Sequence, residues 1–215
     1  MIVCAALVVA PNSDVYTPQE LAGKLVALDY GNGTAYAGLQ MLEGAVPREA
    51  IITCAADASP ADRFARLMRA EFEATVMQEP WITASERAGG RVISTTFFHG
   101  TWVAHRGVDV DAYAAMLRGI TRAVHRINAD KRRYVSYFLR DWAGHPEVDA
   151  LRPEDFDLGR IRLKVPTPIP EAEARWAWEW MAGWGVMSGP FEAATQINHE
   201  VEQKAHELAA AGLAR

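Results

Sequence analysis

Short runs of mostly apolar residues alternate with amphipathic segments up to about residue 100. The apolar runs predict buried strands, and the segments between them carry helix caps and apolar residues at helical spacing. The predicted strands are 2–9, 25–28, 48–54, 74–77 and 92–95. Strands that alternate with helices are typical of βαβ crossovers, so residues 1–100 predict an α/β lobe with a mostly parallel sheet.

The pattern changes over residues 101–215, which we predict to be largely helical. A helix over 109–127, capped by Asp109 or Asp111, carries apolar residues at steps of three and four, and a second helix follows over 130–142. Residues 146–170 are rich in proline and irregular, with one short strand predicted at 161–165. The helical pattern returns over 171–185 and 190–212.

Tryptophan recurs every four residues near the C-terminus. Trp176, Trp180 and Trp184 therefore share one face of a helix, and Trp178 lies on the other side. This spacing favours packing in a core. Aromatic residues on both sides also indicate that a second surface covers the helix.

The stretch 23–44 contains the most suggestive local chemistry. It predicts a strand, a glycine turn at 31–33, a cap at Thr34 and a helix with Leu39 and Leu42 on its buried face. The first turn of a helix leaves N–H groups unpaired at the positive end of the helix dipole, which favours an anion. The turn lacks the spacing of dinucleotide and phosphate-binding loops, so a plain chain reversal is the alternative.

Composition narrows the class of protein. The chain has 215 residues, half of them apolar, which is enough for one large domain or two small lobes. A net charge of −5 without a long basic run argues against nucleic acid or an anionic membrane as a partner. Cys4 and Cys54 lie in strand-like apolar runs, which predicts buried thiols. We expect no membrane span and, from the apolar but uncharged start of the chain, no secretion signal.

Four stretches, in this order and spacing, carry a resemblance over residues 1 to about 143. They are Thr-Pro-Gln-Glu-Leu-Ala-Gly-Lys (17–24), Gly-Asn-Gly-Thr-Ala-Tyr (31–36), Ala-Glu-Phe-Glu-Ala-Thr-Val-Met-Gln-Glu-Pro-Trp (70–81) and Ala-Gly-Gly-Arg-Val-Ile (88–93). The chain resembles the substrate-binding proteins of ABC importers for sulfonates, nitrate, taurine and thiamine-pyrimidine precursors. These form the NMT1/THI5-like branch of the type II periplasmic-binding-protein fold.

The resemblance implies a binding site without a cofactor or metal. In that family the loop after the second strand faces the ligand cleft and holds the acidic group of the ligand. The implied contacts are Asn32, Gly33, Thr34, Ala35 and Tyr36, and the implied cleft wall contains Glu79, Pro80 and Trp81. The implied partners are a small-molecule ligand and an ABC permease.

The family begins with a strand-helix-strand segment of the first lobe that this sequence does not show. Residues 101–215 would then supply the helical remainder of that lobe and the C-terminal helices, and a second chain could complete it. If Met1 is the true start of the protein, we expect a cytoplasmic location. If the chain is a truncated importer component, we expect a periplasmic one.

Three hypotheses follow. The leading one is binding of a small anionic or zwitterionic organic solute without catalysis. The second is an enzyme on the same fold, a decarboxylase or hydrolase of an aromatic or heterocyclic acid. His99 and His105, which flank Trp102 and lack metal-ligand spacing, would be its proton donors. The third is a subunit of a larger assembly, with Trp178 on the surface that a partner covers.

Overall fold

A computed structural model describes residues 2–30, 32–56, 59–101, 105 and 107–213. The chain divides into two compact units. The sheet unit comprises Ile2–Gly100 and Asp130–Arg162, and the helical unit comprises Thr101–Ala129 and Leu163–Arg215. Residues 130–162, which the sequence pattern placed in the helical second part, thus pack with the sheet.

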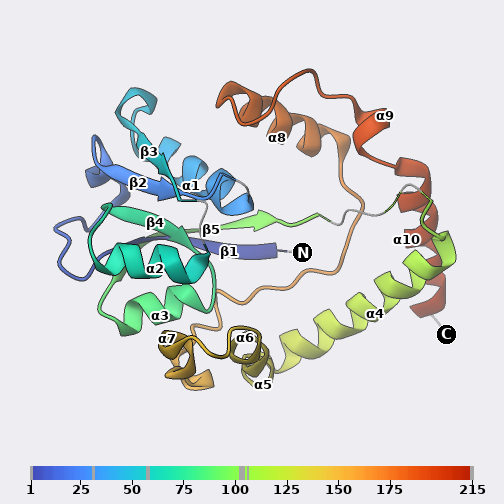
Figure 1. Cartoon of the computed structure of the whole chain (residues 1–215). Coiled ribbons are helices and arrows are strands. Elements are labelled where there is room, and N and C mark those ends of the chain that lie inside the picture. Colours follow the sequence, from blue (N-terminus) through green and yellow to red (C-terminus); the bar gives the residue numbers. More distant parts are fainter. Residues whose placement is uncertain (1, 31, 57–58, 102–104, 106, 214–215) are drawn as a thin grey trace. The chain divides into compact units, whose positions relative to one another are not determined.

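The sheet unit is built on five strands in the order β3-β2-β4-β1-β5 (Figure 1). Their bounds are β1 Ile2–Val9, β2 Leu25–Leu28, β3 Ile52–Ala55, β4 Ala74–Met77 and β5 Arg91–His99. Strand β2 is parallel to β3 and β4, whereas β1 is antiparallel to β4 and β5. Four strands therefore run in one direction, which confirms the α/β fold with a mostly parallel sheet. The reversed direction of β1 was not predicted.

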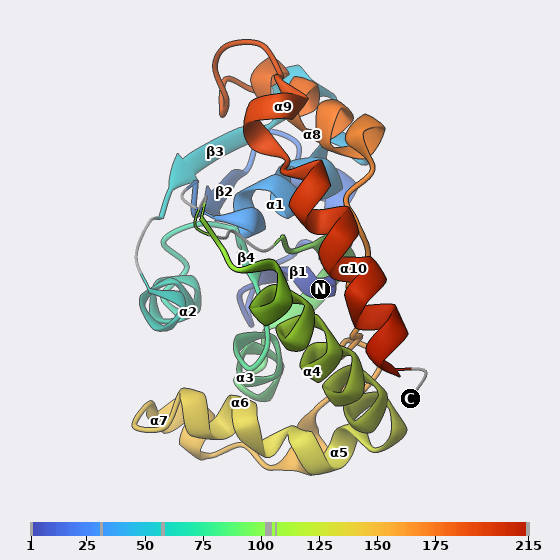
Figure 2. The same cartoon turned by 90° about the vertical axis from the view of Figure 1, so that its right-hand side faces the viewer.

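Helices cover both faces of this sheet (Figure 2). Helix α1 (Gly33–Glu43) lies on one face, where Gly38 contacts Leu28 and Val76. Helices α2 (Pro60–Met68) and α3 (Trp81–Arg87) lie on the other, where Ala27 and Met77 share a core with Phe64 and Trp81. Since side chains alternate along a strand, neighbouring strand residues supply the two separate cores.

The segment 130–162 closes the α2 and α3 face. It contains α5 (Lys131–Tyr134), α6 (Ser136–Asp141), α7 (Pro146–Asp149) and a 3-10 turn, η3 (Pro153–Asp155). Its buried residues Val135, Val148, Leu151, Phe156 and Ile161 join the same core as Trp81. The Arg132 guanidinium donates to the carbonyls of Pro153 and Phe156, and the Lys131 ammonium donates to that of Leu158 at 3.1 Å. These bonds tie the irregular stretch to the start of the helices.

Two of the predicted strands need correction. In place of a strand over 48–54, a 3-10 turn (η2, Arg48–Ala50) follows Pro47, and pairing begins only at Ile52. A 3-10 turn, η1 (Pro18–Leu21), also precedes β2. Residues 161–165 form no strand, because Ile161 inserts into the core instead of lying along a sheet edge.

The helical unit is centred on α4 (Val110–Ala129) and α10 (His199–Leu213), which lie side by side in both views (Figures 1 and 2). Ala114 and Leu117 of α4 pack with Ala205 and Ala209 of α10. Asp109 caps α4 by accepting a bond from the Ala112 amide at 2.7 Å. The predicted helix over 190–212 is interrupted, with α9 (Ala193–Gln196) preceding α10.

The core packing predicted for the tryptophan face is wrong. Helix α8 (Glu171–Gly183) has no buried residue, and Trp176 is 56% exposed. The rings instead find local contacts: Trp180 and Trp184 lie 6.0 Å apart, and Trp178 packs on Phe191 while its indole N–H donates to the Gly189 carbonyl. A spacing of four therefore produced a ring contact along one helix rather than a contact with a core.

The cysteine prediction holds for Cys4, which is buried, whereas Cys54 is partly buried. Burial and the nearby charge of Glu79 raise the pKa of the Cys4 thiol to about 11, so the thiol is protonated at neutral pH. No helix in the described part of the chain combines the length and apolar character needed to span a bilayer.

Two helical glycines test the packing on α1. A Cβ at Gly38 would lie 2.7 Å from side-chain atoms of both Leu28 and Val76, whereas a Cβ at Gly119 in α4 would meet nothing within 4 Å. We expect Gly38→Ala to lower the free energy of unfolding by about 1–2 kcal/mol, because overpacking outweighs the helix-propensity gain. Gly119→Ala should raise it by about 0.5–1 kcal/mol. Urea denaturation measures both, and a stabilised Gly38→Ala would contradict the tight α1 packing.

Candidate functional site

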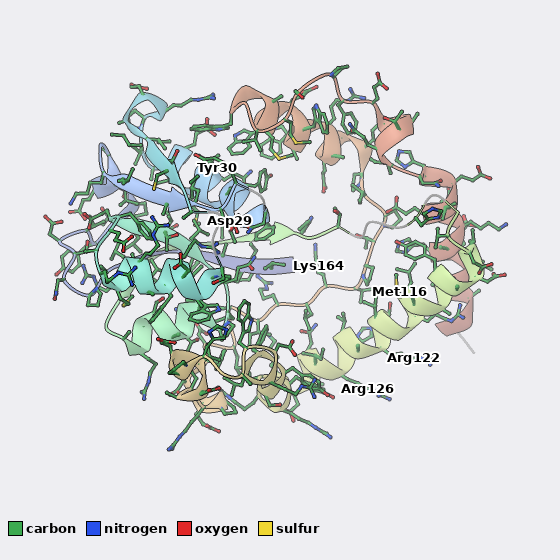
Figure 3. The ribbon with its side chains drawn as sticks, viewed as in Figure 1. Asp29, Tyr30, Met116, Arg122, Arg126 and Lys164 are labelled. Carbon is green, nitrogen blue, oxygen red and sulfur yellow. The ribbon has the colours of Figure 1, made fainter. Side chains whose placement is uncertain are left out.

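The carboxyl ends of β2, β3, β4 and β5 lie at one edge of the sheet, because these strands share a direction. In α/β sheets, ligands bind outside this edge. Helix α1 begins there, after the loop that follows Leu28. Gly31, part of the predicted turn, lies outside the described residues. Figure 3 labels Asp29 and Tyr30, which lie where β2 ends, beside α1.

Asn32 caps helix α1, in place of the predicted Thr34. Its side-chain oxygen accepts bonds from the Thr34 amide at 2.7 Å and from the Thr34 hydroxyl, and its carbonyl accepts from the Ala35 amide at 3.2 Å. The helix therefore starts at Gly33. Asn32 is exposed, whereas Thr34 and Ala35 are buried. An exposed side chain thus satisfies a donor pair in the first turn of a buried helix.

Asp29 holds the Asn32 amide in this orientation. Its carboxylate accepts from the Asn32 side-chain NH₂ and, at 3.0 Å, from the Arg63 guanidinium of α2. Arg63 is only 3% exposed and also reaches the Ala56 carbonyl at 3.4 Å. Because the NH₂ group faces Asp29, the oxygen of Asn32 must face Thr34. Neither Asp29 nor Arg63 was predicted as a site residue.

Phe98 of β5 lies against Gly33. A Cβ built on Gly33 would be 2.5 Å from Cε2 of the Phe98 ring, so no other residue type fits this position while the ring stays there. Phe98 pairs with Val3 in the β1–β5 ladder and is partly exposed. The sequence pattern did not single it out. The predicted strand over 92–95 ended before Phe98, whereas β5 extends to His99.

The hydroxyl of Tyr36, which is partly buried, accepts a bond from the Gln40 amide at 2.8 Å, and burial raises the pKa of Tyr36. The remaining contact predicted for the loop, Ala35, is part of the buried core. The structure thus brings Asn32, Gly33, Thr34, Ala35 and Tyr36 together in the first turn of α1.

Glu79 and Trp81 follow β4 at the same edge but point into the protein. Trp81 is 1% exposed and packs with Phe64, Trp142 and His145. The Glu79 side chain is 5% exposed, and one of its oxygens accepts from the Thr83 amide at 3.1 Å and the Thr83 hydroxyl at 2.8 Å. Its other oxygen lies 3.7 Å from the Arg160 guanidinium. Glu79 and Trp81 are therefore buried beneath this edge of the sheet and do not line a surface there.

The two candidate histidines belong to different units. His99 ends β5 and is exposed, and its neighbour Phe98 faces the other side of the sheet because strand side chains alternate. His105 belongs to the helical unit, where its Nδ1 accepts from the Gly107 amide at 3.1 Å. Trp102, between them, lies outside the described residues. Within the part of the chain that the structure describes, no three His, Cys, Asp or Glu side chains gather as a metal site.

The sequence matches no protein-family model and no curated protein, but its structure has solved neighbours. It superposes with a TM-score of 0.62 on the alkanesulfonate-binding protein SsuA of Xanthomonas axonopodis pv. citri bound to MOPS (16% identity, 86% of this chain, 66% of that one). For the periplasmic aliphatic sulphonate-binding protein SsuA of Escherichia coli the TM-score is 0.63 (18% identity, 94% and 73%). The chain has the fold of periplasmic sulfonate-binding proteins.

The same fold occurs in the desulfurization enzyme DSZB, with a TM-score of 0.56 and 15% identity over 96% of this chain and 78% of that one. This chain spans 66% of the length of the Xanthomonas protein. At such identities the likeness concerns the fold. The loop at Asn32 therefore belongs to a chain with the fold of sulfonate-binding proteins.

The buried Glu79 predicts a pH-dependent stability. Burial raises its pKa, although the Thr83 bonds and Arg160 act in the opposite direction. A carboxyl whose pKa is higher in the folded protein destabilises the fold once it ionises, and this cost disappears below the unfolded pKa of about 4.3. Glu79→Gln should therefore raise the Tm above that of the wild type at pH 8, and the difference should shrink as the pH falls towards 4.

The exposed Glu207, which Gln203 contacts at 3.0 Å, gives the control Glu207→Gln. This variant should follow the wild-type Tm across the whole pH range. A Glu79→Gln difference that stays constant with pH would contradict the assignment of a raised Glu79 pKa.

Proposed function

We propose that the chain binds a small anionic or zwitterionic organic solute, such as a sulfonate, at the start of α1. The observation that carries the proposal is the Asn32 cap. The side-chain oxygen of Asn32, an exposed residue, accepts from both the amide and the hydroxyl of Thr34 in the first turn. An oxygen of a sulfonate or carboxylate can take that place, because it accepts the same Thr34 amide and hydroxyl bonds and carries negative charge to the positive helix end.

The exchange has a defined cost. A side-chain cap is worth about 1 kcal/mol, and an entering anion must replace it. In return the anion gains charge-assisted bonds, which are about twice as strong as neutral ones. The Arg63–Asp29 pair below the loop stays in place, since it contacts the NH₂ side of Asn32 and not the acceptor side. Rotation of the Asn32 side chain away from Thr34 also breaks its bond to Asp29, and the Asp29 carboxylate then keeps the Arg63 guanidinium as its partner.

The fold supports a role in solute uptake. The two sulfonate-binding proteins named above each match more than four-fifths of this chain. We propose a substrate-binding module of an ABC importer, with a permease as its partner. A second chain that packs on α8 is part of the proposal, because Trp176 is 56% exposed. The mass of the purified chain by multi-angle light scattering, alone and with solute, tests for a second copy in this role.

A pair of alanine variants tests the binding site. Asn32→Ala should lower the Tm of the free protein but bind ethanesulfonate or MOPS about fivefold more tightly than the wild type, because the competing cap of about 1 kcal/mol is gone. Thr34→Val, which removes the hydroxyl and keeps the shape, should bind several-fold more weakly. Ligand-induced shifts in Tm and calorimetric titration measure both effects.

Asn198 provides a matched control on another helix. Its side chain accepts from the Val201 amide at 3.2 Å near the start of α10, so Asn198→Ala removes a similar contact. It should lose comparable stability without any change in solute affinity. Equal ligand-induced shifts in Asn32→Ala, Asn198→Ala and wild type would remove the binding site from the start of α1.

An enzyme is the second candidate, favoured by the fold shared with DSZB. In this case the loop would hold the acid group of an aromatic or heterocyclic acid, and His99 or His105 would donate a proton. Incubation with aromatic carboxylates and sulfinates, followed by product analysis, separates the two functions. Turnover that His99→Gln or His105→Gln abolishes would establish the enzyme, whereas binding without product is expected from the solute-binding proposal.

A further inference from the structure

Helix α8 carries an exposed aromatic ring between two exposed acids. Trp176 is 56% exposed, and Glu173 and Glu179 are exposed as well. Since each residue turns about 100° around a helix axis, the two acids lie about 60° to either side of Trp176. The cation of this helix, Arg175, is paired with Glu171 at 2.7 Å. No cation among the described residues pairs with Glu173 or Glu179.

Helix α4 has an exposed face of a different kind on the side opposite its buried residues. This face consists of small residues, a methionine and two arginines: Ala115, Met116, Gly119, Arg122, Ala123 and Arg126. All six lie within about 60° of Gly119 around the helix axis. A Cβ at Gly119 would meet nothing within 4 Å, so the middle of the face is open. A bulky side chain of another helix can therefore approach α4 closely there.

The two arginines of this face lack a counter-charge. Within the part of the chain that the structure describes, neither Arg122 nor Arg126 has an anionic partner. Figure 3 labels both, together with Met116, along α4. They are one helical turn apart, and like charges at this spacing destabilise a helix. An acidic surface that covers the face would remove this repulsion.

The helical unit itself provides little to hold α8. Its described core consists of Ala114 and Leu117 of α4 with Ala205 and Ala209 of α10, and α8 adds no buried residue. An isolated helix of 13 residues is only marginally stable in water. Helix α8 therefore needs a surface that covers its tryptophan.

We propose that α8 of one chain docks on the exposed face of α4 in a second copy. Trp176 then lies over Gly119, and the two flanking carboxylates face Arg122 and Arg126. The pairing rests on the second chain proposed at α8 and does not require solute binding. A two-fold arrangement repeats the contact, because each chain supplies one α8 and one α4. Tryptophan and arginine are the residue types that contribute most at the centre of interfaces.

Charge reversal tests the pairing by sedimentation of the full chain without solute. We expect the wild type to form a dimer, with a mass near twice 23.7 kDa, that dissociates on dilution. Glu173→Arg with Glu179→Arg, or Arg122→Glu with Arg126→Glu, should each weaken this dimer at least about tenfold, because like charges then meet. A mixture of the two variants should regain the wild-type affinity, since each helix then meets opposite charges on the other chain.

Two further variants test the apolar contact. Trp176→Ala should weaken the dimer at least about tenfold. Gly119→Leu, which has room in the single chain, should weaken it similarly by filling the place of the ring. The controls lie on α5 and α6, outside the proposed interface. Tyr137→Ala removes a ring that is 50% exposed, and Arg133→Glu with Arg140→Glu reverses two exposed charges. Both should keep the wild-type affinity.

The outcomes separate the levels of the proposal. A wild type that stays monomeric at every concentration overturns both the second chain at α8 and the pairing inferred here. A dimer that either charge reversal leaves unchanged, or that mixing fails to restore, overturns the α8–α4 pairing alone. Solute binding at the start of α1 is measured separately, by the titrations of Asn32→Ala and Thr34→Val.

Discussion

The Asp29 carboxylate is the interaction on which the proposed site depends. It joins a buried cation, Arg63 of α2, to the exposed cap of α1, Asn32, and so connects helices on opposite faces of the sheet. A guanidinium that is 3% exposed needs a partner, because an unpaired buried charge is very costly. This need fixes Asp29, and Asp29 fixes which atom of Asn32 meets Thr34. The Asp29–Arg63 ion pair thus sets the orientation of the Asn32 side chain.

The start of α1 has its Thr34 donors satisfied by the protein itself. Thr34 and Ala35 are buried, and Asn32, the group that covers the Thr34 donors, is exposed. Such a cap stabilises the free protein at modest cost to binding, since it is worth about 1 kcal/mol while an anion offers more. Phe98 adds an apolar wall beside Gly33.

Much of this architecture is visible in the sequence because it is local. The runs at 2–9, 25–28 and 74–77 are strands at those bounds, and the prediction of an α/β fold is confirmed. The start of α1 was predicted two residues late, with the cap at Thr34 instead of Asn32, because Thr and Asn are both good caps. Only the contact with Asp29 distinguishes them. Contacts between distant residues, such as Arg63 with Asp29 or Phe98 with Gly33, leave no pattern in one sequence.

For the tryptophans, the sequence pattern predicted the wrong contact partners. A spacing of four residues indicates a shared helix face but does not say what covers that face. In the structure the Trp180 and Trp184 rings lie against each other. Trp81 was expected on a cleft wall and lies in the core with Phe64 and Trp142. In both cases the amino-acid type was read correctly as an aromatic contact. The residues that each tryptophan contacts could not be predicted, because they depend on which segments of the chain fold back over the helix.

The central claim is that an anionic group takes the place of the Asn32 oxygen on the Thr34 amide. Amide chemical shifts of the ¹⁵N-labelled chain during titration with ethanesulfonate measure this contact directly. The account predicts saturable downfield shifts of the Thr34 and Ala35 amide protons, together with a change in the side-chain NH₂ signals of Asn32 and no such change for Asn198. Saturable binding that leaves the Thr34 amide and the Asn32 side chain unchanged would contradict it.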